Sequence, residues 1–90
     1  MNKEYLKRQF QIAKDNSYGI CVEILMPNDE IEYIINDFDN LNEKLKYYLE
    51  TYNSELKHKN NDMIVIFDIY PVVVNLNDHI LADRVYVEYE

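Results

Sequence analysis

The first part of the chain carries apolar residues at helical spacing. Leu6, Phe10 and Ala13 lie three or four positions apart and share one face of a helix, so they predict an amphipathic helix from Lys3 to Lys14. The polar residues that follow are expected to end this helix. Gly19 is the only glycine of the chain, and we expect it to take a positive φ at the corner between the helix and the first strand.

The next segment has the pattern of a β-hairpin. Two β-prone runs, Ile20–Met26 and Ile31–Ile35, are separated by a predicted turn over Pro27–Glu30. Alternation along each strand predicts one apolar face, formed by Ile20, Val22, Ile24, Met26, Ile31, Tyr33 and Ile35. The opposite face is expected to carry Glu23, Glu30 and Glu32.

A second helix is predicted to run to about His58. It begins with the pattern of a capping box, in which Asn40 caps the first turn and the Glu43 carboxylate reaches back to it. Asp37 and Asp39 complement the positive end of the helix dipole. An apolar stripe predicts that this helix lies across the sheet, with its contacts made by Leu41, Leu45, Tyr48, Leu49, Tyr52 and Leu56.

The remaining segments complete a predicted sheet. Met63–Tyr70 is strongly β-prone, and Pro71 predicts that this strand ends, bulges or lies on a sheet edge, with 72–74 as a continuation. The last strand is predicted over Arg84–Tyr89. The order α-β-β-α-β-β predicts one α+β domain over residues 1–90, with a mainly antiparallel four-stranded sheet and the helices on one face.

Charge adds information about partners. The chain has 17 acidic and nine basic residues, a net charge of −8, which argues against nucleic-acid binding by phosphate neutralisation and favours a basic protein surface as the partner. Residues 15–43 contain eight acids and no base. Closely spaced carboxylates imitate phosphates, so the candidate partner-binding residues are Glu30, Glu32, Asp37, Asp39 and Glu43. The alternative is a solvated face that keeps the protein soluble and caps a helix.

Nine tyrosines and no tryptophan suit a recognition surface, because tyrosine joins a rigid ring to a polar tip. Tyr48 and Tyr52 belong to the core stripe. Tyr47 points off the stripe and is a further candidate partner-binding residue, with Tyr33 and Tyr86 also expected to face outward. The alternative is that the tyrosines form cross-strand pairs that stabilise the sheet.

Patterns typical of catalytic, cofactor and metal sites do not occur in the sequence. Asp37-x-Asp39 does not continue into a calcium loop, because Leu41 and Asn42 stand where an oxygen ligand and a glycine are required. His58 and His79 are expected in surface loops. We therefore expect no enzyme activity, no cofactor and no metal.

Cys21 is the only cysteine, which excludes an internal disulfide and favours a reducing cytoplasm. It is expected as a small, buried or half-buried apolar residue on the strand face opposite Ile20 and Val22. The first residues are polar and lack the apolar region of a signal peptide, and no apolar run is long enough to span a bilayer. These features predict a cytoplasmic protein without a membrane partner.

Two stretches, EYIIN at 32–36 and NLNEKLKYYLETYN at 40–53, together with Leu56-Lys57, resemble small acidic proteins of Firmicutes phages and integrated elements. This group includes anti-CRISPR proteins, which inhibit the RNA-guided type II CRISPR nuclease, some of them by occupying its DNA channel. The resemblance implies a DNA mimic that acts by occupancy on that nuclease, or on another one, in the host bacterial cytoplasm.

The sequence leaves a second class of function open. Pro71 and the valine-rich run 72–74 place apolar groups near a predicted sheet edge, where exposure favours aggregation. A homodimer that buries such an edge would make the chain a structural or assembly protein. The two hypotheses are therefore an inhibitor of a basic, nucleic-acid-handling protein and a homodimeric assembly protein.

Overall fold

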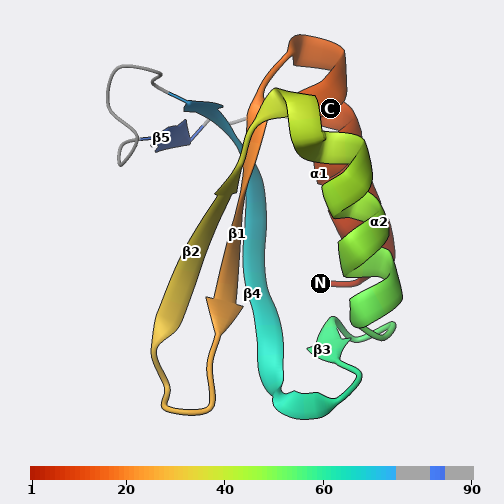
Figure 1. Cartoon of the computed structure of the whole chain (residues 1–90), viewed down its shortest axis with the longest axis vertical. Coiled ribbons are helices and arrows are strands. Elements are labelled where there is room, and N and C mark those ends of the chain that lie inside the picture. The colour runs from red at the N-terminus through yellow and green to blue at the C-terminus, as the bar shows by residue number, and fades with distance from the viewer. Residues whose placement is uncertain (75–81, 85–90) are drawn as a thin grey trace.

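Two helices pack on one face of an antiparallel sheet (Figure 1). The computed structural model describes residues 1–74 and 82–84. Its elements are α1 (Lys3–Asn16), β1 (Gly19–Leu25), β2 (Ile31–Asn36), the short 3-10 helix η1 (Phe38–Asn40), α2 (Leu41–Thr51), β3 (Lys57–His58), β4 (Asn61–Val74) and β5 (Ala82–Arg84). This confirms the predicted α+β class and element order, to which the two-residue strand β3 is an addition.

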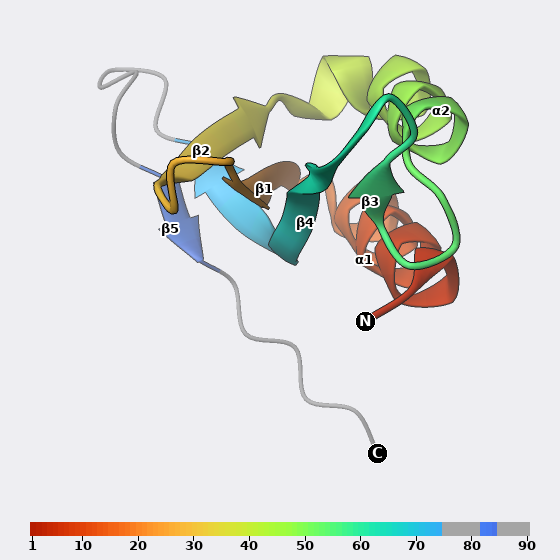
Figure 2. The same cartoon turned by 90° about the horizontal axis from the view of Figure 1, so that it is seen from below.

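The sheet is organised around the long strand β4. The strand order is β2-β1-β4-β3, all neighbours are antiparallel, and β5 also pairs with β4. On one side of β4, both Val65 and Val72 pair with β1. On the other side, Val65 pairs with β3 and Val72 pairs with β5. Figure 2 shows β2 at the edge of the sheet that is farthest from α1.

The hairpin between β1 and β2 has a three-residue loop, Pro27–Asp29. The Asp29 amide donates to the Met26 carbonyl (3.0 Å), and the Met26 amide donates to the Glu30 carbonyl (2.8 Å), so Met26 and Glu30 form the last rung. Asp29 has a φ of 65°, which is the left-handed residue that ends this kind of loop. The predicted four-residue turn is therefore one residue too long.

This difference moves every side chain of β2 to the other face of the sheet. Val22 pairs with Ile34 and Ile24 with Glu32, and paired residues point to the same side. The predicted faces were thus wrong for the second strand: Tyr33 and Ile35 lie on the face away from the helices, and Glu32 lies on the same face as Ile24. Glu30 follows the same alternation, whereas Glu23 does lie opposite the core, as predicted.

The core lies between the helices and one face of β1 and β4. The predicted face of α1 is confirmed, and so is most of the apolar stripe, with Leu45 and Leu49 packed partly buried against it. The core residues are Leu6, Phe10, Ala13, Ile20, Val22, Ile24, Leu41, Tyr48, Tyr52, Leu56, Ile66 and Ile69. Burying this apolar surface is the main stabilising contribution to a domain of this size.

The corner after α1 is made without glycine. The Tyr18 amide donates to the Ala13 carbonyl (2.9 Å) and the Ser17 amide to the Lys14 carbonyl (3.4 Å), which is the Schellman pattern. Ser17 takes the left-handed conformation, with a φ of 58°. The expected positive φ at Gly19 was therefore wrong: Gly19 is the first residue of β1 and pairs with Val72.

Both ends of α2 differ from the prediction. The Asn40 amide donates to the Asp37 carbonyl (3.0 Å) within η1, and the Asn40 side chain makes no capping hydrogen bond. The predicted capping box was wrong, because the amide that Glu43 was expected to bind is already used. The helix ends at Thr51 rather than near His58, since Asn53 Oδ1 accepts from the amides of Glu55 and Lys57 and turns the chain.

Strand β4 continues through Pro71 to Val74, so the strand does not end at the proline. Pro71 pairs with Ile20 of β1, and its neighbour Val72 pairs with β1 on one side and with β5 on the other, so the predicted edge position was wrong: β4 is an interior strand of the sheet. The bulge lies at Phe67, between the pairs Ile24–Ile66 and Glu23–Asp68. The predicted last strand, 84–89, lies outside the described residues except for Arg84.

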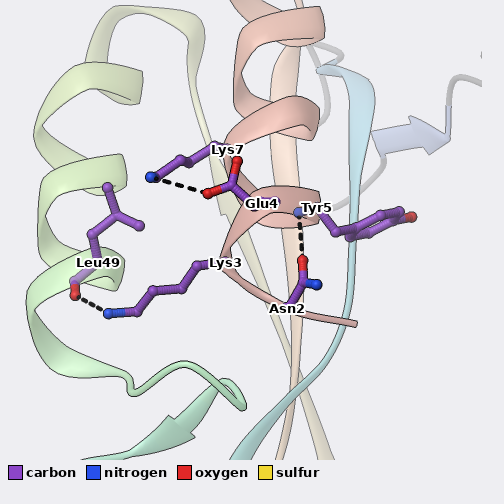
Figure 3. A network of polar contacts seen from close by, with 6 residues as sticks. All are labelled: Asn2, Lys3, Glu4, Tyr5, Lys7 and Leu49. Atoms are coloured by element: carbon purple, nitrogen blue, oxygen red, sulfur yellow. Dashed lines mark hydrogen bonds and ion pairs between the residues drawn. The ribbon is translucent and has the colours of Figure 1, made fainter.

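Two polar contacts join the helices to each other and to the sheet. The Lys3 Nζ donates to the Leu49 carbonyl (2.9 Å; Figure 3), which satisfies a carbonyl in the last turn of α2 and places a cation at the negative end of its dipole. The buried Asn36 side chain hydrogen-bonds with the Tyr48 side chain, and its Nδ2 donates to the Ile20 carbonyl (3.4 Å). Asn36 therefore links β1, the end of β2 and α2.

The Asn36–Tyr48 contact predicts a stability difference between two adjacent tyrosines. Tyr48→Phe removes one of the two hydrogen-bond partners of the buried Asn36 side chain and is expected to lower the free energy of unfolding by about 1–3 kcal/mol. Tyr47→Phe makes the same chemical change at an exposed ring and is expected to stay within about 0.5 kcal/mol of wild type. Urea denaturation measures both, and equal effects of the two substitutions would contradict the assigned contact.

Candidate functional site

The five acidic candidates form two groups at opposite ends of β2. Glu30 and Glu32 lie at the hairpin end, and Asp37, Asp39 and Glu43 lie beyond the other end, on η1 and the first turn of α2. Asp37 follows Glu32 by five positions and Glu30 by seven, so the groups lie roughly 20 Å apart along the strand at about 3.3 Å per residue. All five side chains are exposed, but the structure does not bring them together as one cluster.

The hairpin group is oriented by the loop. The Glu30 amide donates to Asn28 Oδ1 (3.2 Å), which fixes the backbone at the entry to β2. Glu32 shares the sheet face that α2 covers, and its negative charge contributes to the raised pKa of Tyr52. The Glu32 carboxylate therefore lies on the helix side of the sheet, near the end of α2, and not on the outer face that the sequence predicts.

The other acidic group borders a hollow at the end of the sheet where α1 meets β1. The hollow has a volume of about 260 Å³ and is lined by Ser17, Tyr18, Gly19, Asp37, Phe38, Asp39, Val72 and Val73. It is built where three segments converge: the corner after α1, the turn η1 and the end of β4. Asn36 is fixed in the core, and the η1 turn that follows leaves the Asp37–Asp39 side chains exposed.

A second hollow lies on the other side of the same turn. It is lined by Lys14, Phe38, Asp39, Leu41 and Asn42. Phe38 and Asp39 border both hollows, and the Phe38 side chain is 44% exposed. The sequence analysis missed Phe38, although an aromatic residue between two aspartates, with no place in either apolar stripe, was the signal that marked it.

Tyr47 faces outward, as predicted, and Tyr86 lies outside the described residues. Tyr33 also faces outward, which agrees with its place among the candidate recognition tyrosines but not with the predicted packed face of β2. The Tyr47 side chain is 49% exposed, and its ring contacts Tyr48 edge-on at 5.1 Å between centroids. Tyr47 follows Glu43 by four positions, so the two share one face of α2. The Tyr33 side chain is 64% exposed on the outer face of β2.

A row of side chains on the outer face surrounds the single cysteine. Cys21 is buried, as predicted, and pairs across the strands with Ile35 and Tyr70. Burial raises the pKa of Tyr70, and hydrogen bonds with Cys21 and Glu23 raise it further. Cys21 is thus part of the packing of the sheet.

His58 differs from its predicted place in a surface loop. It is half-buried in β3, its Nδ1 accepts from the Asn60 amide (3.0 Å), and its ring contacts Tyr52 at 5.4 Å. His79 lies outside the described residues. In the part of the chain that the structure describes, no three His, Cys, Asp or Glu residues are grouped as metal ligands, and no described helix is long and apolar enough to cross a membrane.

Comparisons with known proteins identify no relative of this chain. No family model, no curated protein and no solved structure matches it. The features of the described residues that bear on function are the two acidic groups and the hollow beside one of them.

The tyrosine cluster predicts how stability changes at high pH. Burial, together with the charges of Tyr47, Tyr48 and Glu32, raises the pKa of Tyr52 from 10.0 to about 12. The unfolded chain therefore loses this proton first, so the stabilising contribution is complete below pH 10 and is lost as the pH rises toward 12. Urea midpoints measured across this window should fall less steeply in Tyr52→Phe than in wild type. The exposed Tyr33→Phe control should follow wild type, and an identical slope in Tyr52→Phe would contradict the assignment.

Proposed function

We propose that the protein is a non-enzymatic binding module whose acidic residues engage a basic surface on a nucleic-acid-handling protein. The observation that carries this proposal is the segment 15–43, which has eight acids and no base. Its exposed candidates, Glu30, Glu32, Asp37, Asp39 and Glu43, meet solvent on the hairpin and around η1. Exposed carboxylates of one sign steer a basic partner and set the register of the complex.

The spacing of the two acidic groups supports a DNA-like surface. A separation of roughly 20 Å along β2 equals the length of DNA helix axis over which one strand carries about six phosphates, one for every 3.4 Å of axis. Tyr47 lies on the same face of α2 as Glu43 and adds an exposed aromatic ring to that end. A channel that binds nucleic acid through lysine and arginine would accept both groups at once.

The target that fits this proposal best is the RNA-guided type II CRISPR nuclease, in the host bacterial cytoplasm. The resemblance of residues 32–36 and 40–53 to small acidic phage proteins supports this choice over another nuclease. The protein would act as an anti-CRISPR inhibitor by occupying the DNA channel, with no cofactor and with one molecule bound per nuclease. Such inhibition weakens as salt rises, because exposed charges are screened beyond about 8 Å at physiological ionic strength.

An order-of-addition assay tests this mode of inhibition. Nuclease that has bound its target DNA first is expected to be protected, and nuclease that meets the protein first is expected to be inhibited at a 1:1 ratio, with less inhibition at higher salt. Glu30→Lys/Glu32→Lys should weaken inhibition, whereas Glu4→Lys/Glu50→Lys makes the same change in net charge on the helices and should not. Inhibition below stoichiometric amounts, or inhibition that ignores salt and order of addition, would reject occupancy of the channel.

A homodimer is the second candidate, and the edge position of β2 favours it. Of the apolar run that the sequence placed near a sheet edge, Pro71 and Val72 are buried and Val73 is exposed, but the run lies in the interior strand β4. Exposed apolar side chains also lie on an edge strand: Tyr33 and Ile35 belong to β2, which is the first strand in the sheet order. An edge strand with exposed apolar side chains pairs readily with a second copy.

Sedimentation equilibrium distinguishes the homodimer from the monomeric inhibitor. A dimer formed through β2 should dissociate when Tyr33→Lys places a charge on this edge, while Tyr47→Lys on α2 leaves it intact. A strict monomer at high concentration in the wild-type protein would remove the homodimer from consideration.

A further inference from the structure

We propose that the hollow lined by Tyr18, Asp37, Phe38 and Asp39 receives one arginine side chain of the basic partner. This inference rests on the proposed function and identifies the contact that gives it specificity. The acidic segment as a whole attracts any cation, but this hollow has a shape and a set of side chains that fit one kind of residue. It would be the anchor of the interface, where a buried side chain contributes most of the affinity.

The charges around the turn η1 distinguish its two hollows. Among the described lining residues, the hollow with Tyr18 contains the carboxylates of Asp37 and Asp39 and no basic side chain. The neighbouring hollow shares Phe38 and Asp39 but also has the basic residue Lys14 in its lining. The first hollow is therefore the more acidic of the two and the better fit for a cation from a partner.

The apolar part of the lining favours arginine over lysine. The flat guanidinium is weakly hydrated, stacks on aromatic rings and donates to two carboxylate oxygens at once. Phe38 and Tyr18 provide rings at the edge of the hollow, while Val72 and Val73 provide apolar contacts for the arginine stem. Lysine carries a strongly hydrated point charge and would lose more hydration on entering.

The size of the hollow suits a single side chain. Its volume of about 260 Å³ is below the roughly 300–1,000 Å³ of sites that hold a small molecule or cofactor. Gly19 contributes no side chain to it and is buried at the start of β1. The absence of a side chain at this position keeps the space beside Asp37 and Phe38 open.

Titration of the isotope-labelled protein with short peptides tests the proposal without any partner protein. The probe is acetyl-Gly-Arg-Gly-amide, and the controls replace arginine by lysine or by its uncharged isostere citrulline. Saturable NMR shifts are expected at Tyr18, Gly19 and Phe38 with the arginine peptide, weaker ones with lysine and none with citrulline. Shifts of equal size with citrulline, or spread evenly to Glu30 and Glu32, would overturn the proposal.

Two pairs of variants assign the binding to the hollow. Asp37→Asn/Asp39→Asn keeps the shape and removes the charge, and it should abolish the saturable shifts. Glu30→Gln/Glu32→Gln removes the same charge at the other end of β2 and should leave them unchanged. All four positions are exposed, so the fold is expected to persist, and unchanged NMR signals elsewhere in each variant verify this. Retained affinity in Asp37→Asn/Asp39→Asn would contradict the proposal.

The same variants separate failure of this inference from failure of the proposed function. In the nuclease assay, Asp37→Asn/Asp39→Asn should lower the affinity by about tenfold or more, as expected for an anchor contact. Full inhibition by this variant would reject the arginine hollow and retain the inhibitor. Peptide binding in the hollow, without any inhibition by the wild-type protein, would retain the hollow and reject the nuclease as its target.

Discussion

The register of the β1–β2 hairpin is the constraint on which the rest of the molecule depends. The three-residue loop ends with Asp29 in the left-handed conformation and pairs Met26 with Glu30. Because side chains alternate along a strand, this choice decides which half of β2 faces the helices. It places Ile34 and Asn36 on the helix side and leaves Tyr33 on the outer face. A loop longer by one residue with continuous pairing would exchange the two sets.

The buried position of Asn36 links the register of the hairpin to the geometry of the candidate site. With its side chain buried against Tyr48 and the Ile20 carbonyl, the end of β2 is tied to α2 and to β1. The chain must then turn at once, and η1 is that turn. Its residues are left at the surface, where Asp37 and Phe38 meet the corner after α1. A polar residue in the core thus positions the charged residues outside it.

The sequence was sufficient for features that depend on long periodic patterns. The face of α1, the class of fold and the burial of Tyr48 all follow from repeated apolar spacing. The sequence was insufficient for the orientation of β2, which depends on a single residue of loop length. Both faces of β2 carry apolar residues, such as the neighbours Ile34 and Ile35, so the pattern does not show which face packs against the helices. The hollow was beyond prediction for a related reason, since its walls come from segments far apart in the chain.

The local capping signals were misleading for an equally physical reason. Asn40 and Glu43 match a capping box, but the Asn40 amide is already bound within η1. Likewise, Gly19 is not needed for the left-handed corner, because Ser17 takes that conformation within the Schellman pattern. In both cases, backbone hydrogen bonds determine the conformation of the turn. The types of the residues in the turn do not show which of these hydrogen bonds form.

Cross-strand NOEs between α-protons test the hairpin register directly. Antiparallel neighbours bring α-protons close together at alternate pairs, where the Cα atoms are about 4.5 Å apart. This register predicts NOEs between the α-protons of every second pair in the series Cys21–Ile35, Val22–Ile34 and Glu23–Tyr33. Contacts that join Val22 to Tyr33 or to Ile35 as direct partners would contradict the register, and with it the placement of Asn36 and the acidic turn.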